Sequence, residues 1–175
     1  ALTPDGTEPC VHYGELFTEY GVSIQETRSR TNKFQGDFRS VRNDVLMPTS
    51  DVTPRGLAKA SCVLVDGVVL GGDILVIRTD PALVSGIFLS RMIRMEEAQV
   101  LRLVTGTTVF HLYAADMKKF TFMLPTAAEQ VAIAEALSDD PTLRLAAATR
   151  LSTWSRQGYF DELARYDEFD PNGSI

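Results

Sequence analysis

Hydrophobic and polar positions follow different periods along the chain, and each stretch predicts a different kind of structure. Residues 57–124 contain short apolar runs, rich in β-branched and aromatic side chains, that are separated by turn residues. Beyond Pro125 the apolar positions recur every three to four residues, which is typical of helices. The chain therefore divides into a β-rich centre and a helical C-terminal part.

The N-terminal part carries one short periodic segment. Tyr13, Leu16, Phe17 and Tyr20 recur at helical spacing between Pro9 and Gly21, so a short helix is predicted over residues 11–20. A strand over residues 17–25 is the alternative, because apolar and polar residues alternate towards its end. Residues 26–42 are polar and basic, and they predict a long loop or an edge hairpin.

The central region predicts consecutive strands joined by tight turns. Asp66-Gly67 is typical of a two-residue hairpin turn, and it separates apolar runs over residues 60–65 and 68–70. Further strands are predicted over residues 74–78, 83–95, 100–104, 107–114 and 119–124. Because parallel pairing would need helical crossovers, these strands favour one antiparallel sheet that curls or closes on itself.

The C-terminal part contains two helix starts that can be read directly. Thr126 and Glu129 have the spacing of a capping box, and Asp140 precedes Pro141 as an N-cap precedes the first helical residue. A third short helix is predicted around residues 160–164. The expected fold is mainly β with C-terminal helices (α+β): a small antiparallel β-barrel capped by a C-terminal helix, plus a helical extension.

The expected domain organisation follows these changes of pattern. Residues 1–44 form an N-terminal segment with a short helix or strand and a basic loop, residues 45–138 form the barrel with its capping helix, and residues 139–175 form the helical extension. The 175 residues are 45% hydrophobic and 23% charged, which is ordinary for a globular protein. No apolar stretch approaches the roughly 18 residues that cross a bilayer.

Charge and cysteine content limit the classes of partner and compartment. With 17 basic and 23 acidic residues the net charge is −6, so nucleic acid is not expected as a partner. Only two cysteines occur, Cys10 and Cys62, and Cys62 lies in an apolar run typical of a buried thiol. This favours the cytoplasm or another reducing compartment, with a single disulfide as the alternative.

Two groups of residues are candidate binding surfaces. The first, called here the basic run, could hold an anionic ligand such as a phosphoinositide headgroup, or could be a solvated loop; it consists of Arg28, Arg30, Lys33, Arg39 and Arg42. The second is a set of aromatic residues near the C-terminus: Trp154, Tyr159, Phe160, Tyr166 and Phe169. These aromatic residues either pack back on the barrel or are buried against another protein chain, which is the partner we expect.

Part of the β-rich region resembles pleckstrin-homology domains, and most closely their GRAM variant. In GRAM domains a charged turn leads into an F-x-F strand, similar to Ala115-Asp116-Met117-Lys118 followed by Phe120-Thr121-Phe122, and residues 88–96 are similar to the strand that precedes this pair. The resemblance implies a barrel that serves as an interaction module. In phosphoinositide-binding members of that superfold, basic residues lie in an early hairpin loop, as the basic run would.

A second resemblance implies a different function. Asp51-Val52-Thr53-Pro54-Arg55-Gly56 is similar to the D-x-S-x-x-G element of PilZ domains, barrels that bind cyclic di-GMP. Such domains also need an R-x-x-x-R element, and neither Arg28-Ser29-Arg30 nor Arg39-Ser40-Val41-Arg42 has that spacing. A plain turn, with Pro54 fixing φ and Gly56 allowing a tight exit, is the structural alternative.

No motif indicates catalysis. The sequence lacks a nucleophile elbow, a Walker loop, a dinucleotide fingerprint and the H-E-x-x-H zinc motif. A zinc site is numerically conceivable from Cys10, His12, Cys62 and His111, but their spacing is not that of known sites. We therefore expect no enzyme, cofactor or metal, and predict a non-catalytic protein-interaction or scaffold module in a larger assembly; the alternative is a PilZ-like cyclic dinucleotide sensor.

Overall fold

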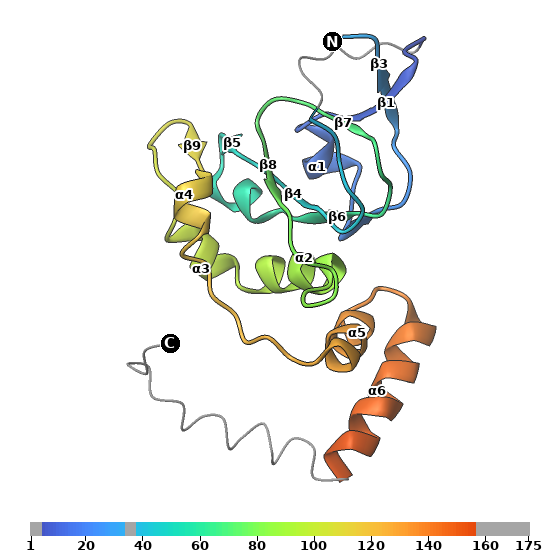
Figure 1. The fold of residues 1–175 in the computed structure, drawn as a ribbon. Helices are drawn as coiled ribbons and strands as arrows, with labels where there is room; N and C mark the ends of the chain where they lie inside the picture. Colours follow the sequence, from blue (N-terminus) through green and yellow to red (C-terminus); the bar gives the residue numbers. More distant parts are fainter. Residues whose placement is uncertain (1–4, 34–37, 157–175) are drawn as a thin grey trace. The chain divides into compact units, whose positions relative to one another are not determined.

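The computed structural model of the chain describes residues 5–33 and 38–156, with side chains as far as residue 150. Backbone contacts divide the chain into two units, residues 1–130 and residues 131–175, and each is described by itself. The first unit combines short strands with helices, and the described residues of the second unit are mainly helical (Figure 1). The α+β class with C-terminal helices is thus confirmed.

The first unit begins with strands and ends with helices. Its elements are β1 (Glu8–Val11), α1 (Glu15–Thr18), β2 (Ser23–Ile24), β3 (Ser29–Thr31), β4 (Val45–Pro48), β5 (Ser50–Asp51), the 3-10 helix η1 (Pro54–Ala58), β6 (Ser61–Val63), β7 (Val69–Leu70), β8 (Ile74–Ile77), α2 (Gly86–Met95), α3 (Glu97–Leu101), β9 (Phe110–His111), α4 (Ala114–Met117) and the start of α5 (Ala127–Ala136). The predicted N-terminal helix is shortened to α1, because β1 takes up Val11 at its start.

The described strands form three small sheets, of which two are mixed and one is an antiparallel pair. Their orders are β3-β1-β7, β2-β6-β4-β8 and β5-β9. Two of the pairings, β1 with β7 and β2 with β6, are parallel, so the prediction of one antiparallel sheet is wrong. The described strands show no closed barrel, which leaves the barrel unconfirmed. Asp66-Gly67 forms a turn with Gly67 at a φ of 76°, but the strands that it connects lie in different sheets.

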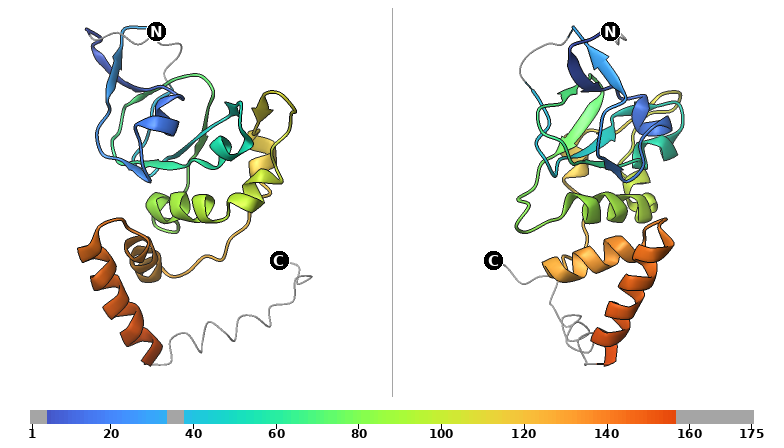
Figure 2. Two further views of the ribbon diagram at one scale, coloured as in Figure 1. Left: turned by 180° about the vertical axis from the view of Figure 1, so that it is seen from behind. Right: turned by 90° about the vertical axis from the view of Figure 1, so that its right-hand side faces the viewer.

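Strand β4 lies between two hydrophobic cores. Successive strand side chains point to opposite faces, and all four residues of β4 are buried. Val45 and Met47 belong to the core that also contains residues of α2, whereas Leu46 belongs to the core that contains Leu16 of α1. Figure 1 and Figure 2 show α2 on one side of the sheet and α1 on the other. The central sheet is therefore covered on both faces.

Helix α2 occupies a segment that the sequence predicts as a strand. Ser85 caps it, with its hydroxyl accepting from the backbone N–H of Phe88 at 3.4 Å, and Phe88, Leu89 and Ile93 are buried on one face. A Cβ at Gly86 would lie 2.5 Å from the Asn43 carbonyl oxygen, so the glycine permits close packing. The strand prediction fails because a buried apolar run of this length suits either structure.

Two further predicted strands are also absent from the described residues. The run 100–104 begins in α3, which ends at Leu101, and residues 119–124 have no regular secondary structure. Of the predicted strand over residues 107–114, only β9 is formed, and it pairs with β5. By contrast, the polar segment predicted as a loop or an edge hairpin contributes β3, which pairs antiparallel with β1.

Both predicted helix starts are confirmed. The Glu129 carboxylate accepts from the Thr126 backbone N–H at 2.7 Å, while the Thr126 hydroxyl accepts from the Glu129 backbone N–H at 3.5 Å. In the second unit α6 (Pro141–Arg156) begins after Asp140, whose Oδ1 accepts from the Thr142 N–H at 2.8 Å. Among the described residues, no helix is long and apolar enough to span a membrane.

Candidate functional site

Of the basic run, only Arg30 lies in a strand, and much of the run's charge is used to hold the protein's own backbone. Arg30 on β3 donates to the carbonyl oxygens of Gly6 and Thr7, both at 2.8 Å. Arg39 donates to the Glu8 carboxylate at 2.8 Å and to the Gly67 carbonyl at 2.9 Å. Since β1 and β7 lie between them, Arg30 and Arg39 stand at opposite edges of one sheet.

The remaining members of the basic run differ in how they are held. Arg42 donates to the Leu64 carbonyl at 2.7 Å. The backbone N–H of Arg28 donates to the Tyr20 hydroxyl at 2.9 Å, and the side chains of Arg28 and Lys33 are exposed. Three of the five predicted ligand-binding side chains are thus committed to structural bonds.

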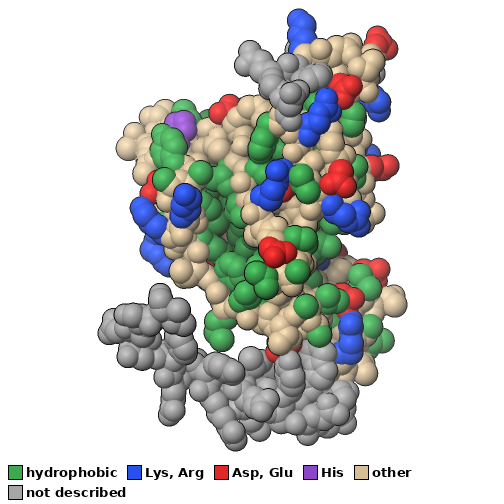
Figure 3. Space-filling model, in the orientation of Figure 1, with side chains coloured by type: hydrophobic (Ala, Val, Ile, Leu, Met, Phe, Trp, Pro, Cys, Tyr) green, Lys and Arg blue, Asp and Glu red, His purple; other side chains and the backbone are tan. Residues whose placement is uncertain are grey.

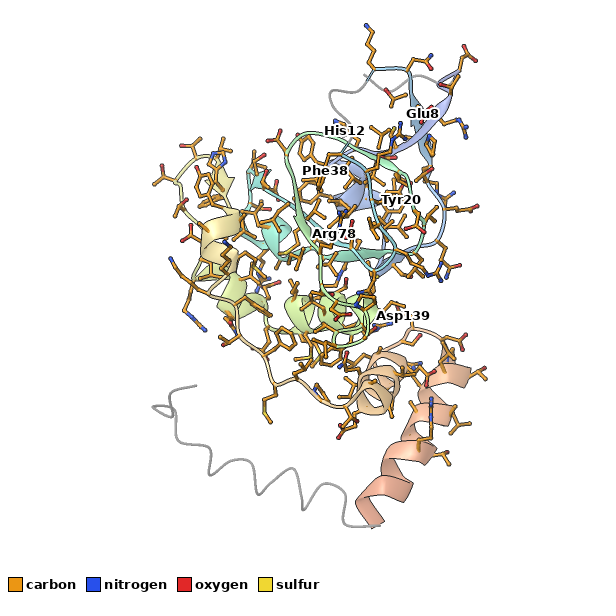
Figure 4. The ribbon with its side chains drawn as sticks, viewed as in Figure 1. Glu8, His12, Tyr20, Phe38, Arg78 and Asp139 are labelled. Carbon is orange, nitrogen blue, oxygen red and sulfur yellow. The ribbon has the colours of Figure 1, made fainter. Side chains whose placement is uncertain are left out.

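A second cluster was not predicted from the sequence. It consists of an ion pair between Arg78 and Asp44, with the Phe38 ring beside Arg78. Arg78 donates to both carboxylate oxygens of the buried Asp44, each at 2.8 Å, and this bonding raises the Arg78 pKa above its usual value. The Arg78 guanidinium also lies 5.7 Å from the ring centre of Phe38, and Figure 4 shows these two side chains close together. Because the Asp44 carboxylate is buried and paired with Arg78, we interpret the cluster as a structural ion pair.

The loop that precedes β9, residues 105–109, is fixed by hydrogen bonds where it meets the strand. Thr105 and His111 exchange two backbone hydrogen bonds, at 3.0 and 2.7 Å. The Leu112 N–H donates to the Thr49 carbonyl at 2.9 Å, and His111 pairs with Ser50 of β5. Gly106 has a φ of 111°, and a Cβ there would overlap the Val109 carbonyl. The loop therefore has a defined conformation that needs glycine at this position.

The segment around this loop is locally basic although the chain is acidic. Residues 98–128 contain three basic side chains, Arg102, Lys118 and Lys119, and one acidic side chain, Asp116. Lys119 pairs with Asp116 at 2.7 Å. Figure 3 shows Lys and Arg side chains gathered over the part of the first unit formed by α3 and α4. We call Arg102, Lys118 and residues 105–108 the β9 surface.

An aromatic pair borders the β9 surface. The rings of His111 and Tyr113 are stacked, with centroids 6.0 Å apart and an interplanar angle of 20°. Tyr113 is 55% exposed, so one face of the pair reaches solvent. An exposed ring on a fixed backbone can contact a flat or sugar-like group of a partner at small entropic cost.

The hexapeptide that resembles the PilZ element runs from the end of β5 into the 3-10 helix η1. The Asp51 carboxylate accepts from the Val52 N–H at 2.7 Å and from the Thr53 hydroxyl at 2.8 Å. A Cβ at Gly56 would overlap this carboxylate, which explains the glycine. Thr53 bonds to Asp51, Arg30 to the carbonyl oxygens of Gly6 and Thr7, and Arg42 to that of Leu64, so each of these side chains is engaged in a different part of the fold.

The cysteines and histidines do not form a metal site in the part of the chain that the structure describes. No group of three His, Cys, Asp or Glu side chains there could hold a metal ion. Cys10 lies on β1 and Cys62 on β6, in different sheets, and both are buried free thiols. Burial raises the pKa of Cys62 to about 12, so this thiol is not activated as a nucleophile.

The predicted aromatic partner surface falls largely outside the described residues. Trp154 lies on α6, but its side chain is not among those described. The other four members, Tyr159, Phe160, Tyr166 and Phe169, lie beyond residue 156. The prediction that they contact another chain remains a prediction.

Comparison with known proteins gives one line of evidence. No family model matches the chain, and no curated protein matches it. Among solved structures, the chain is similar to the S subunit of a type-I restriction-modification system from M. genitalium, at 20% identity and a TM-score of 0.52. The match covers 95% of this chain and 41% of that subunit, so the chain spans less than half of its neighbour's length. The two share a fold.

This neighbour overturns both sequence resemblances. The residues that suggested a GRAM domain adopt other structures: residues 88–96 lie mainly in α2, residues 115–117 lie in α4, and residues 120–122 form no strand. Alternating hydrophobicity in short runs occurs in many folds, which is why the match misled. The pleckstrin-homology, PilZ and phosphoinositide interpretations are therefore wrong.

The expectation that nucleic acid is not a partner is also wrong, since the neighbour belongs to a restriction-modification system. The physical error lies in using net charge. A value of −6 averages over the whole chain, whereas binding depends on the charge of one surface. The sequence prediction placed Arg102, Thr107 and Thr108 in strands, and it did not weigh the local excess of basic over acidic residues around them.

Proposed function

We propose that this chain recognises double-stranded DNA as a non-catalytic subunit of a larger assembly. The observation that carries the proposal is the similarity over 95% of the chain to the S subunit of a restriction-modification system. Restriction and modification both act on DNA, and the partners of such a subunit are the chains that cut or modify it. In this function the chain supplies recognition and no chemistry of its own.

The β9 surface supports the proposal through its chemistry. Proteins hold DNA mainly by Lys, Arg, hydroxyl and backbone N–H contacts to phosphate oxygens. The β9 surface combines two cations with hydroxyl groups on a fixed loop, and the acidic residues of the chain lie mostly elsewhere in the sequence. Arg28 and Lys33 of the basic run are a second candidate for phosphate contacts, because their side chains are exposed.

Contacts with other subunits are assigned to a different part of the chain. We propose the aromatic residues Trp154, Tyr159, Phe160, Tyr166 and Phe169 for this role, because aromatic residues are enriched in the cores of protein interfaces. A cytoplasmic location fits this function, since the DNA and the partner subunits are there.

The test is selection of DNA sequences from a random pool by the full chain. Duplexes with a randomised centre are incubated with the immobilised chain, eluted with salt, amplified and sequenced over several rounds. We expect a short sequence motif to be enriched, and the enriched duplex to bind more tightly than a scrambled duplex. A chain that binds no duplex, or that binds single strands better than duplexes, would contradict the proposed function.

A further inference from the structure

We propose that the β9 surface holds backbone phosphate groups and does not read bases, so that it contributes affinity for DNA irrespective of sequence. This inference rests on the proposed function and assigns its residues. The groups concerned are the side chains of Arg102 and Lys118 and the hydroxyls of Thr107 and Thr108. Sequence recognition would then lie on another part of the chain.

The hydroxyl groups of the loop are available for a ligand. Thr107 and Thr108 are exposed, and no hydrogen bond to either hydroxyl is formed by any other residue in the described part of the chain. The two backbone bonds between Thr105 and His111, together with the positive φ of Gly106, fix the loop that carries them. A loop that is already ordered loses little conformational entropy when it binds.

The two cations are likewise available. Arg102 caps the C-terminal end of α3, and Lys118 follows α4; both are exposed and form no ion pair among the described residues. Two nearby cations differ in this respect. Lys119 is paired with Asp116 at 2.7 Å, and Arg55 is paired with Glu97 at 3.0 Å. The unpaired cations are the better ligands for phosphate because no carboxylate has to be displaced.

The residue types around the loop favour phosphate over bases. Bidentate reading of adenine uses Asn or Gln, whereas Arg and Lys, which can read guanine, also pair with phosphate oxygens whatever the base. The single amide side chain in residues 98–128 is Gln99, and both of its ends are occupied: its Oε1 accepts from the Thr121 N–H at 2.6 Å and its Nε2 donates to the Thr121 carbonyl at 3.0 Å. Lysine and threonine are general phosphate ligands.

The experiment compares variants on two duplexes. Lys118→Gln, the double variant Thr107→Val/Thr108→Val, and Lys33→Gln of the basic run are measured by fluorescence anisotropy at 50 to 200 mM salt. Each is titrated with the enriched duplex and with a scrambled duplex. Arg144→Gln, on an exposed position of α6, is the matched control for loss of one positive charge. Circular dichroism and thermal melting confirm that each variant is folded.

We expect Lys118→Gln to weaken binding to both duplexes by the same factor. One phosphate contact changes the slope of log K against log salt by about 0.9, which corresponds to roughly eightfold in affinity at 0.1 M salt. The threonine double variant should weaken both complexes without changing this slope, because it removes no charge. Arg144→Gln should change the slope by less than a third of the Lys118 effect.

Different results would overturn this inference. Lys118→Gln that binds both duplexes as tightly as the unchanged chain, or that loses affinity for the enriched duplex alone, contradicts a phosphate role. A loss confined to Lys33→Gln would move the phosphate contact to the basic run and also refute it. In each case the unchanged chain still binds DNA, so the proposed function stands.

Sodium tripolyphosphate separates failure of the inference from failure of the proposed function. If the chain binds tripolyphosphate but no duplex, and Lys118→Gln abolishes tripolyphosphate binding, the phosphate site is supported and the proposed recognition of DNA is refuted. If the chain binds neither probe, both proposals are refuted.

Discussion

Replacing Arg78 with methionine should destabilise the first unit by removing the partner of a buried carboxylate. The Asp44 side chain is 1% exposed, and its two oxygens accept from Nε and Nη2 of Arg78, each at 2.8 Å. Its remaining bond comes from the Val41 N–H, also at 2.8 Å. Methionine keeps most of the aliphatic stem but leaves the carboxylate with one donor.

The magnitude follows from the exposure of the two partners. Breaking a fully buried ion pair costs about 3–5 kcal/mol, and a hydrogen bond to a charged group contributes about 1.5–3 kcal/mol. Arg78 is 47% exposed, so water can reach the carboxylate from its side when the guanidinium is removed. We therefore expect a loss of about 2–3 kcal/mol in the free energy of unfolding, which is less than for a fully buried pair.

Urea unfolding, followed by circular dichroism, measures this change. With a urea dependence of about 1–3 kcal/mol per molar, the midpoint should fall by roughly 1 M. Asp44→Asn completes a double-mutant cycle, and neutralising the orphaned carboxylate should recover part of the loss in the Arg78→Met background. A loss below about 0.5 kcal/mol, or two effects that simply add, would refute the argument that Arg78 compensates a buried charge.

Three further predictions concern packing, pH and capping. Gly86→Ala should cost about 1–3 kcal/mol in thermal unfolding, since its Cβ would lie 2.5 Å from the Asn43 carbonyl oxygen and 2.7 Å from the Cys62 sulfur; an unchanged melting temperature would contradict this. Because burial raises the pKa of Cys62 to about 12, the thiol ionises at lower pH in the unfolded chain than in the folded one. The free energy of unfolding should therefore fall as pH rises from about 9 to 12, by at most about 1.4 kcal/mol per pH unit. Urea unfolding at each pH measures this dependence, and Cys62→Ala should reduce it. Thr126→Ala should cost about 1 kcal/mol and increase amide exchange in the first turn of α5, whereas equal exchange would argue against the capping box with Glu129.

Features set by neighbouring residues could be predicted from the sequence. The capping box at Thr126 and the N-cap at Asp140 depend on side chains within three positions of the groups they bind, and both were identified. The parallel pairs β1–β7 and β2–β6 join segments far apart in the chain, and no local signal specifies them. Alternating runs were read as one antiparallel series for this reason.

The candidate site shows the same division between local and distant information. The sequence identifies where positive charge is concentrated, but it does not reveal that Arg30 and Arg39 donate to carbonyl oxygens more than 20 residues away. The β9 surface has fewer cations than the basic run, yet Arg102 and Lys118 have no ion-pair partner among the described residues. Whether a charged side chain is bonded within the protein depends on the tertiary structure, which the sequence pattern does not show.

The placement of β4 between two cores has a consequence for how the first unit unfolds. A change at Met47 disturbs the packing against α2, a change at Leu46 disturbs the packing around α1, and both strain the same short strand. Because the two cores share β4, unfolding of one core should disrupt the other. We therefore expect the unit to unfold in one cooperative step. Exposed loop positions that belong to neither core can then vary in sequence with little loss of overall stability, whereas a change in either core lowers the stability of the whole unit.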